Sequence, residues 1–152
     1  MENKKVIPNA VSKVTIHYEP AVKTSEMHTV SSAEEIADLV RGYWEDLEYR
    51  ESFYVLLLNK ANKVLGLNKT FAGGIDLMSV DIKVILQLAL TSNAASIVIM
   101  HNHPSGSLTR SQQDDAITKR IKNACALCEV KLLDHIILTG ESHVSYASEG
   151  EL

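Results

Sequence analysis

The sequence has few of the features that place a chain outside ordinary globular proteins. Its 152 residues include only two cysteines, Cys125 and Cys128, which are too few for a disulfide framework and fit a reducing, cytoplasmic compartment. No apolar run approaches the roughly 18 residues of a membrane span, and no apolar segment follows the charged N-terminus. Neither a membrane association nor a secretory signal is therefore expected.

An excess of positive charge is also missing. The chain carries 15 Lys and Arg against 19 Asp and Glu, which gives a net charge of −4 and a pI of about 5.8. Charge therefore does not support nucleic acid as a partner, although a local basic patch stays open. With 45% hydrophobic and 22% charged residues, the chain has the composition and length of one globular domain with its own core.

The first part of the chain is expected to form a loose lead-in before the folded domain. Residues 13–18 are rich in β-branched side chains and predict a short strand. Residues 32–48 predict the first helix, because apolar residues recur there at helical spacing. Ser32 and Glu35 match a capping box at its start.

Further along, apolar runs of strand length alternate with amphipathic segments. A second helix is expected over residues 80–92, capped by Ser79, and a third from Ser111 to about Cys128. Strands are expected over residues 53–58, 64–71, 95–100, 130–138 and near 144–147. This order predicts an α/β sandwich with a mixed sheet. We divide the chain into a lead-in over residues 1–30 and a domain over residues 31–152.

A histidine pair stands where one of the buried strands is expected to end. His101 and His103 alternate along an extended segment, so both imidazoles point to the same side and can reach one ion. Pro104 favours extended backbone at His103. Ser111 and Asp114 follow at a spacing that brings them onto one helix face. Two imidazoles and one carboxylate predict a Zn²⁺ site with a fourth position open to water, the pattern of catalytic zinc.

A catalytic zinc site also needs a base that accepts the proton of the attacking water. Glu51 is the best placed carboxylate, because it comes just before the strand expected over residues 53–58. If that strand pairs with residues 95–100, its first residue lies beside the metal. Three other glutamates stay open on the pattern alone: Glu45, Glu48 and Glu129.

The spacing of these residues resembles the signature of the JAMM (JAB1/MPN) metallohydrolases. That signature is H-x-H, seven residues, then S-x-x-D, and it falls here on His101, His103, Ser111 and Asp114. Three further runs resemble the RadC family in particular: HNHPSG at 101–106, ESF at 51–53 and LDHII at 133–137. The resemblance covers roughly residues 30–150, nearly the whole chain.

The resemblance implies a cytidine-deaminase-like three-layer α/β sandwich with a mixed sheet and a zinc-dependent hydrolase site. It implies that His101, His103 and Asp114 bind Zn²⁺, that Glu51 acts as acid and base, and that Ser111 stabilises the oxyanion. JAMM enzymes cleave peptide or isopeptide bonds, so a protein or peptide substrate is expected. RadC proteins also carry a traditional DNA-repair label.

One feature of typical RadC proteins is not found in this sequence. They place a helix-hairpin-helix region before the JAMM domain, whereas the roughly 30 residues before the first expected helix lack its glycine-containing hairpin pattern. Direct binding to duplex DNA is therefore not expected. The alternative to an enzyme is a non-catalytic zinc-binding accessory domain, or an interaction domain associated with DNA repair.

Some of these side chains also have a purely structural interpretation. Ser111 can cap its helix, with Asp114 favourable in the first turn, and this role is compatible with a catalytic one. Glu51 can be a solvated charge at a strand edge. His135 lies between apolar residues and is interpreted as a core histidine or as one that supports the site, with Asp134 or nearby backbone as its hydrogen-bond partner.

Cys125 and Cys128 form a C-x-x-C pair that invites comparison with the zinc deaminases. The deaminase signature is H-x-E followed by P-C-x-x-C. Here His103 stands in place of the glutamate, and no proline precedes Cys125. Both cysteines are therefore expected to act as small apolar residues late in the third helix.

Overall fold

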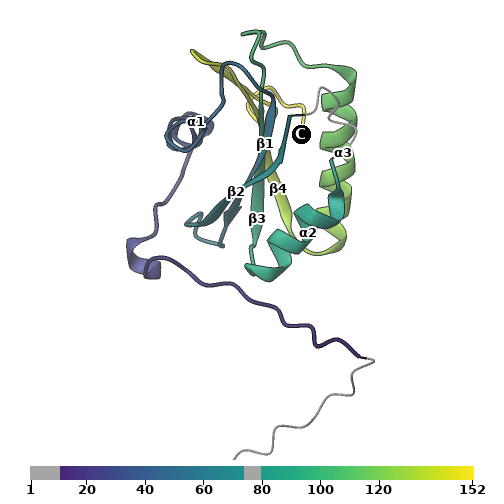
Figure 1. Ribbon diagram of the computed structural model, residues 1–152. Helices are drawn as coiled ribbons and strands as arrows, with labels where there is room; N and C mark the ends of the chain where they lie inside the picture. The colour runs from purple at the N-terminus through teal and green to yellow at the C-terminus, as the bar shows by residue number, and fades with distance from the viewer. Residues whose placement is uncertain (1–10, 74–79) are drawn as a thin grey trace, which may run out of the picture.

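The computed structural model describes residues 11–73 and 80–152 of the chain (Figure 1). Within these ranges the elements follow in the order η1 (Thr24–Glu26), α1 (Ala33–Arg41), β1 (Ser52–Leu58), β2 (Val64–Ala72), α2 (Ile82–Thr91), β3 (Ser96–Asn102), α3 (Gln112–Leu127), β4 (Lys131–Leu138) and β5 (His143–Ser145). Across the described residues, no helix is both long enough and apolar enough to cross a bilayer.

The strands form one mixed sheet in the order β2-β1-β3-β4-β5. β3 and β4 run parallel, and the other neighbours are antiparallel. Helix α1 lies on one face of this sheet, and α2 and α3 lie on the other, as Figure 1 shows. The three-layer α/β sandwich with a mixed sheet is thus confirmed.

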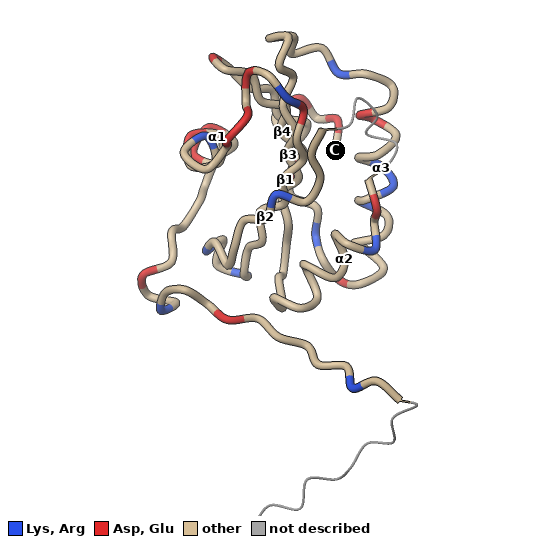
Figure 2. The backbone as a smooth tube through the Cα atoms, viewed as in Figure 1, with Lys and Arg blue, Asp and Glu red and all other residues tan. Residues whose placement is uncertain are grey.

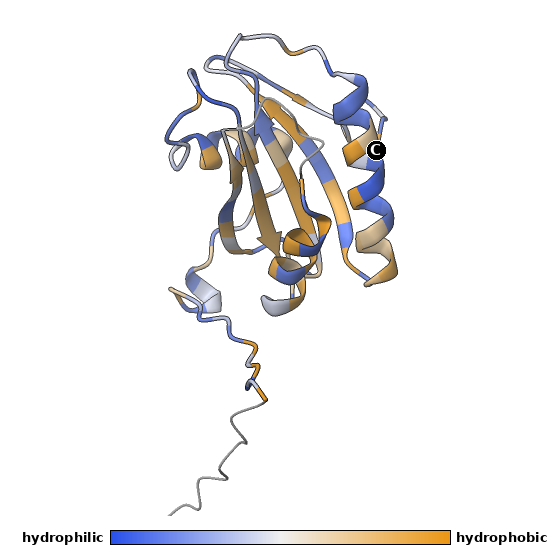
Figure 3. Cartoon of the chain, turned by 45° about the vertical axis from the view of Figure 1, so that its right-hand side comes forward, coloured by the Kyte–Doolittle hydropathy of each residue, from blue (hydrophilic) through white to orange (hydrophobic). Residues whose placement is uncertain are grey.

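The core lies on both faces of the central strands, because β1 and β3 are buried along their whole length. In β1, Phe53, Val55 and Leu57 pack into the apolar cluster under α2 and α3. The alternate residues Tyr54 and Leu56 pack into the cluster under α1. Figure 3 shows the apolar character of these strands. A continuous apolar run is typical of a strand covered on both faces, as the sequence predicted.

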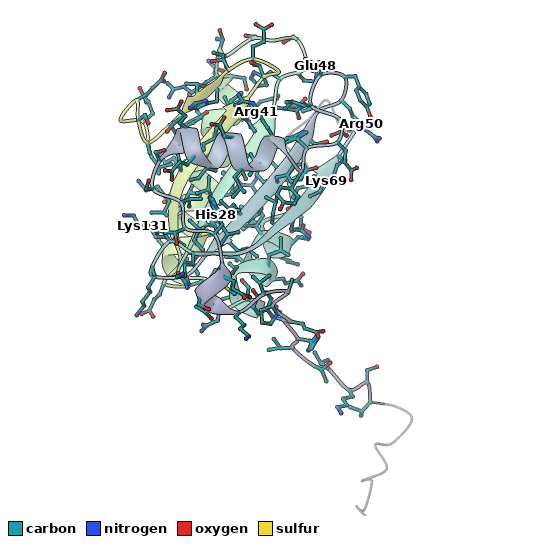
Figure 4. The ribbon with its side chains drawn as sticks, turned by 90° about the vertical axis from the view of Figure 1, so that its left-hand side faces the viewer. His28, Arg41, Glu48, Arg50, Lys69 and Lys131 are labelled. Carbon is teal, nitrogen blue, oxygen red and sulfur yellow. The ribbon has the colours of Figure 1, made fainter. Side chains whose placement is uncertain are left out.

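Charged side chains of both signs are distributed over the surface. In Figure 2, acidic and basic positions are mixed along α3 and around the sheet. Figure 4 looks onto α1, with Arg41 on that helix and Lys69 on β2 among the labelled residues. Lys69 Nζ lies 3.1 Å from a carboxylate oxygen of Asp46, and Arg41 forms an ion pair with Asp38. Two of the basic groups on this face are therefore already paired with acidic ones.

Two predictions about the N-terminal third were wrong. Residues 13–18 form no strand, since they pair with no strand among the described residues and leave Val14 and Ile16 more than four-fifths exposed. The first helix ends at Arg41 rather than near residue 48, because Gly42 favours the end of a helix. The chain then turns so that the ring of Trp44 packs on that of Tyr54, with 4.1 Å between ring centroids.

Helix caps account for where the helices begin. Ser32 accepts a hydrogen bond from the backbone N–H of Glu35, as predicted, but the Glu35 carboxylate binds Ser31 instead of closing the box. Helix α2 begins later than predicted, because Asp81 is its N-cap. The cap predicted at Ser79 lies outside the described residues. Helix α3 begins after Ser111 and ends before Cys128, as predicted.

Candidate metal centre

The pairing of β1 with β3 determines which side chains meet at the carboxyl end of β3. Phe53 lies opposite His101 in this antiparallel register. Glu51 comes two residues before Phe53 and His103 two residues after His101, and the period of two keeps all four side chains on the same face. This is the face covered by α3. The strand pairing proposed from the sequence is therefore confirmed.

At this position the two histidine rings lie close together. His101 Nε2 and His103 Nε2 are 3.1 Å apart, and the His101 side chain is fully buried. One carboxylate oxygen of Glu51 and one ring nitrogen of each histidine all lie within 4.8 Å of one another. Imidazole nitrogens and carboxylate oxygens are common ligands of divalent metals. Glu51, His101 and His103 could therefore hold a metal ion.

The loop after β3 fixes the orientation of the second histidine. Gly106 donates its backbone N–H to the carbonyl of His103, closing a tight turn, and its φ of 83° is a conformation that glycine adopts without strain. His103 Nδ1 then lies 2.7 Å from the carbonyl oxygen of Ser107. Because a carbonyl can only accept, Nδ1 carries the ring proton, and the lone pair of Nε2 faces His101.

Helix α3 brings a second carboxylate to the two rings. Ser111 Oγ accepts a hydrogen bond from the Asp114 N–H, and the Asp114 carboxylate accepts one from the Ser111 N–H, so the two residues form a complete capping box. The Asp114 oxygens lie 3.2 Å from His101 Nε2 and 3.7 Å from His103 Nε2. All five residues that the sequence predicted for the site are thus brought together.

The environment shifts the pKa values of the two carboxylates in opposite directions. Burial opposes the ionisation of Asp114, but the hydrogen bond from the Ser111 backbone N–H favours the ionised form, and the pKa of Asp114 lies below its ordinary value. Burial raises the pKa of Glu51. Burial also lowers the pKa of His101, so this ring is neutral at pH 7. The environment therefore favours the ionised form of Asp114 and the protonated form of Glu51.

Asn102, between the two histidines, is a residue whose role the sequence analysis missed. Its side chain points to the opposite face of the sheet and is completely buried. Its amide oxygen accepts a hydrogen bond from the Ser52 N–H at 2.7 Å, and its amide nitrogen donates to the carbonyls of Leu47 and Arg50. Asn102 thereby attaches the segment that carries Glu51 to the strand that carries the histidines. The signal for this role in the sequence was a polar amide side chain within an otherwise apolar strand.

Replacing Asn102 with alanine is expected to lower the free energy of unfolding by about 2–4 kcal/mol, because three hydrogen bonds are lost and the buried N–H of Ser52 is left without a partner. Urea denaturation followed by circular dichroism measures this change. Asn123→Ala is the matched control, since Asn123 is exposed on α3. An Asn102→Ala variant as stable as that control would contradict the role assigned to this amide.

Two further polar side chains lie directly behind the site. The ring of His135 on β4 is completely buried, with Nε2 at 2.8 Å from His101 Nδ1. Its Nδ1 lies 2.5 Å from the hydroxyl of Thr118 on α3. The interpretation of His135 as a residue that supports the site agrees with this geometry. Asp134 accepts a hydrogen bond from the backbone N–H of His135 rather than from its ring, and Thr118 was not foreseen.

Asp115, the neighbour of the proposed ligand Asp114, and Cys125 lie away from the two histidine rings. Asp115 accepts a hydrogen bond from the Tyr146 hydroxyl at 2.8 Å and does not face the metal centre. Cys125 is buried in the core under α2 and α3, and burial raises the pKa of its thiol to about 11. It follows Asp114 by eleven residues of α3, about 16 Å along the axis. The cysteines therefore cannot join His101 in a deaminase-type site.

Comparison with known proteins identifies the same family that the sequence motifs of the site resemble. The RadC-like JAB domain matches residues 30–151. A UPF0758 protein of Flavobacterium johnsoniae is 43% identical over 100 residues, which cover 66% of this chain and 44% of that protein. A UPF0758 protein of Vibrio cholerae is 42% identical over 103 residues, covering 68% and 65% respectively. A third, of Thiobacillus denitrificans, is 38% identical over 123 residues, covering 81% and 54%.

The chain thus spans about half the length of most of these curated relatives. The match to the domain family covers most of the chain, and it includes every residue of the metal centre. On this evidence the chain belongs to the RadC-like JAB domain family.

Proposed function

We propose that this domain is a zinc-dependent hydrolase of the JAMM type that cleaves a peptide or isopeptide bond in a protein or peptide substrate. The observation that carries the proposal is the convergence of His101 Nε2, His103 Nε2 and the Asp114 carboxylate, with Glu51 beside them. Three protein donors together with a neighbouring acid/base are typical of catalytic zinc.

The separations of the donor atoms fit a zinc ion. Ligands at the usual zinc distances, arranged tetrahedrally, lie about 3.3 Å from one another. The two ring nitrogens are 3.1 Å apart; Asp114 Oδ1 lies 3.2 Å from His101 Nε2, and the other oxygen, Oδ2, lies 3.7 Å from His103 Nε2. Without a cation, two imidazole lone pairs and an ionised carboxylate would face each other at these distances, which is electrostatically unfavourable.

Asp114 and Glu51 compete for the role of third ligand, and we assign it to Asp114. Its Oδ1 lies 3.2 Å from His101 Nε2 and its Oδ2 lies 3.7 Å from His103 Nε2, while one Glu51 oxygen lies within 4.8 Å of both ring nitrogens. Asp114 is also the carboxylate with the lowered pKa, and a metal ligand must be ionised. The raised pKa of Glu51 suits a group that takes up and releases a proton.

Each of these residues then has its own role in amide hydrolysis. Zinc at this site would lower the pKa of water and polarise the scissile carbonyl. Glu51 accepts a proton from the attacking water and delivers it to the leaving amine as the C–N bond breaks. The Ser111 oxygen already accepts a hydrogen bond from Asp114, so its own O–H is free to donate to the oxygen of the carbonyl under attack.

The proposal predicts about one zinc per chain and cleavage of peptide or isopeptide bonds. Zinc content after gel filtration is measured by mass spectrometry. Cleavage is measured on a panel of peptide and isopeptide substrates, with and without a chelator. A purified wild-type protein that binds no zinc, even when zinc is supplied, would rule the proposal out.

A non-catalytic accessory domain is the second outcome of the same test. Such a domain would bind zinc through the same three donors, yet the cellular function of the protein would survive replacement of Glu51. A Glu51→Gln variant that replaces the wild-type protein fully in cells, with no cleavage by either form, would favour this role.

A further inference from the structure

A buried chain of hydrogen bonds runs from one proposed ligand back to another. It begins at His101 Nδ1, which lies 2.8 Å from His135 Nε2. It continues from His135 Nδ1 to the hydroxyl of Thr118 at 2.5 Å, and from that hydroxyl to the backbone carbonyl of Asp114 at 2.6 Å. All four residues are buried, so no solvent competes for these bonds.

The donor in each hydrogen bond follows from the bond at the end of the chain, between Thr118 and the Asp114 carbonyl. A carbonyl oxygen can only accept, so the Thr118 hydroxyl donates its single proton to Asp114. The Thr118 oxygen must then accept a proton from His135 Nδ1. A buried, neutral His135 has one ring proton only, so its Nε2 accepts from His101 Nδ1. A neutral His101 is thereby left with a bare lone pair on Nε2, the atom that faces His103 and Asp114.

The opposite direction makes as many hydrogen bonds but fits the distances less well. Thr118 would then donate to His135, His135 would donate to His101, and His101 Nε2 would donate to the Asp114 carboxylate. The Thr118 hydroxyl oxygen and the Asp114 carbonyl oxygen would face each other at 2.6 Å with no proton between them. Two acceptors at that distance repel, whereas in the first direction the bare His101 Nε2 lies 3.2 Å from the nearer Asp114 oxygen.

We infer that Thr118 and His135 are positioning residues that hold His101 in the tautomer whose Nε2 is ready to bind a metal. This inference rests on the proposed zinc site. His103 is fixed by a single backbone carbonyl, whereas His101, deep in the core, is fixed through two side chains. Partners that orient a metal-binding histidine are known to raise metal affinity.

Packing prevents the His135 ring from reversing its hydrogen bonds by rotation. Tyr146 stacks on it with 4.7 Å between ring centroids and an angle of 13° between the planes. Phe53 lies on the same ring at 6.5 Å, inclined by 58°. The imidazole is therefore held in one orientation, with Nδ1 toward Thr118 and Nε2 toward His101.

The test compares Thr118→Val with Thr118→Ser. Valine keeps the shape of the side chain but removes the hydroxyl, and zinc affinity is expected to fall about 10–100-fold. Serine keeps the hydroxyl, and affinity is expected to stay close to that of the wild type. Zinc affinity is measured by competition with a chromophoric chelator, and circular dichroism confirms that each variant is folded. Equal affinities for the valine variant and the wild type would overturn the inference.

A second measurement needs no metal and so separates this inference from the proposed function. Nitrogen chemical shifts of the imidazoles distinguish the two tautomers in the metal-free protein. The Nδ1–H form is expected for both His101 and His135, and it is expected to be lost at His101 in Thr118→Val. An Nε2–H form of His101 in the metal-free wild type would overturn the inference. Failure of the wild type to bind zinc would instead contradict the proposed function.

Discussion

Replacing Asp114 with asparagine is expected to weaken zinc binding by more than about 100-fold, beyond the loss typical of residues that only orient a ligand. The amide keeps the size of the side chain and an oxygen that can accept the Ser111 N–H, so the helix cap is retained. It removes the negative charge that lies 3.2 Å from His101 Nε2. Zinc per chain and chelator competition measure the effect.

Asp115→Asn is the matched control for this variant. It makes the same change of charge at the next residue, but Asp115 is exposed and contacts Tyr146. Its zinc affinity is expected to equal that of the wild type. If Asp114→Asn keeps its zinc while Glu51→Gln loses it, the ligands are Glu51, His101 and His103, and the proposed roles of the two carboxylates are reversed.

Replacing Glu51 with glutamine is expected to leave zinc bound and to lower kcat by about 10²–10⁴-fold, the usual contribution of a general acid/base. Glutamine retains the shape of the side chain and cannot carry the proton. The rate is measured on whichever substrate of the peptide and isopeptide panel the wild type cleaves. Because the substitution removes catalysis but leaves substrate binding intact, the variant should also retain protein substrates in a pull-down from cells.

Glu48→Gln controls for the loss of one nearby acidic group. Glu48 is exposed in the turn before β1 and was one of the glutamates left open by the sequence. Its kcat is expected to match that of the wild type. A Glu51→Gln variant with undiminished turnover would exclude Glu51 as the acid/base, whatever its zinc content.

The parts of the fold that the sequence predicted are those whose signals are local. The apolar runs of β1 and β3 are long and uninterrupted, and each of them could only be covered on both faces. Ser111 opens α3 with a complete capping box, so the start of this helix was clear. The H-x-H spacing gave the direction of both imidazoles, because side chains alternate along an extended chain.

The parts that it did not predict depend on partners far away in the chain. Asn102 has a role only because residues 47–52 lie against it. Thr118 is one turn after Asp114, but its meaning depends on His135 from another strand. The segment 13–18 has the composition of a strand, yet no strand pairs with it within the described residues. Local propensity does not contain this information.

The register between β1 and β3 also limits which insertions and deletions the domain can accept. Losing one residue between Glu51 and Phe53 would turn the Glu51 side chain to the α1 face, away from both histidines, because strand side chains alternate. The turn at Lys60 and Ala61 lies at the other end of the strand, between β1 and β2. Lengthening that turn leaves the register unchanged. We therefore expect the spacing from Glu51 to β1 to be more constant among functional homologues than the length of this hairpin turn.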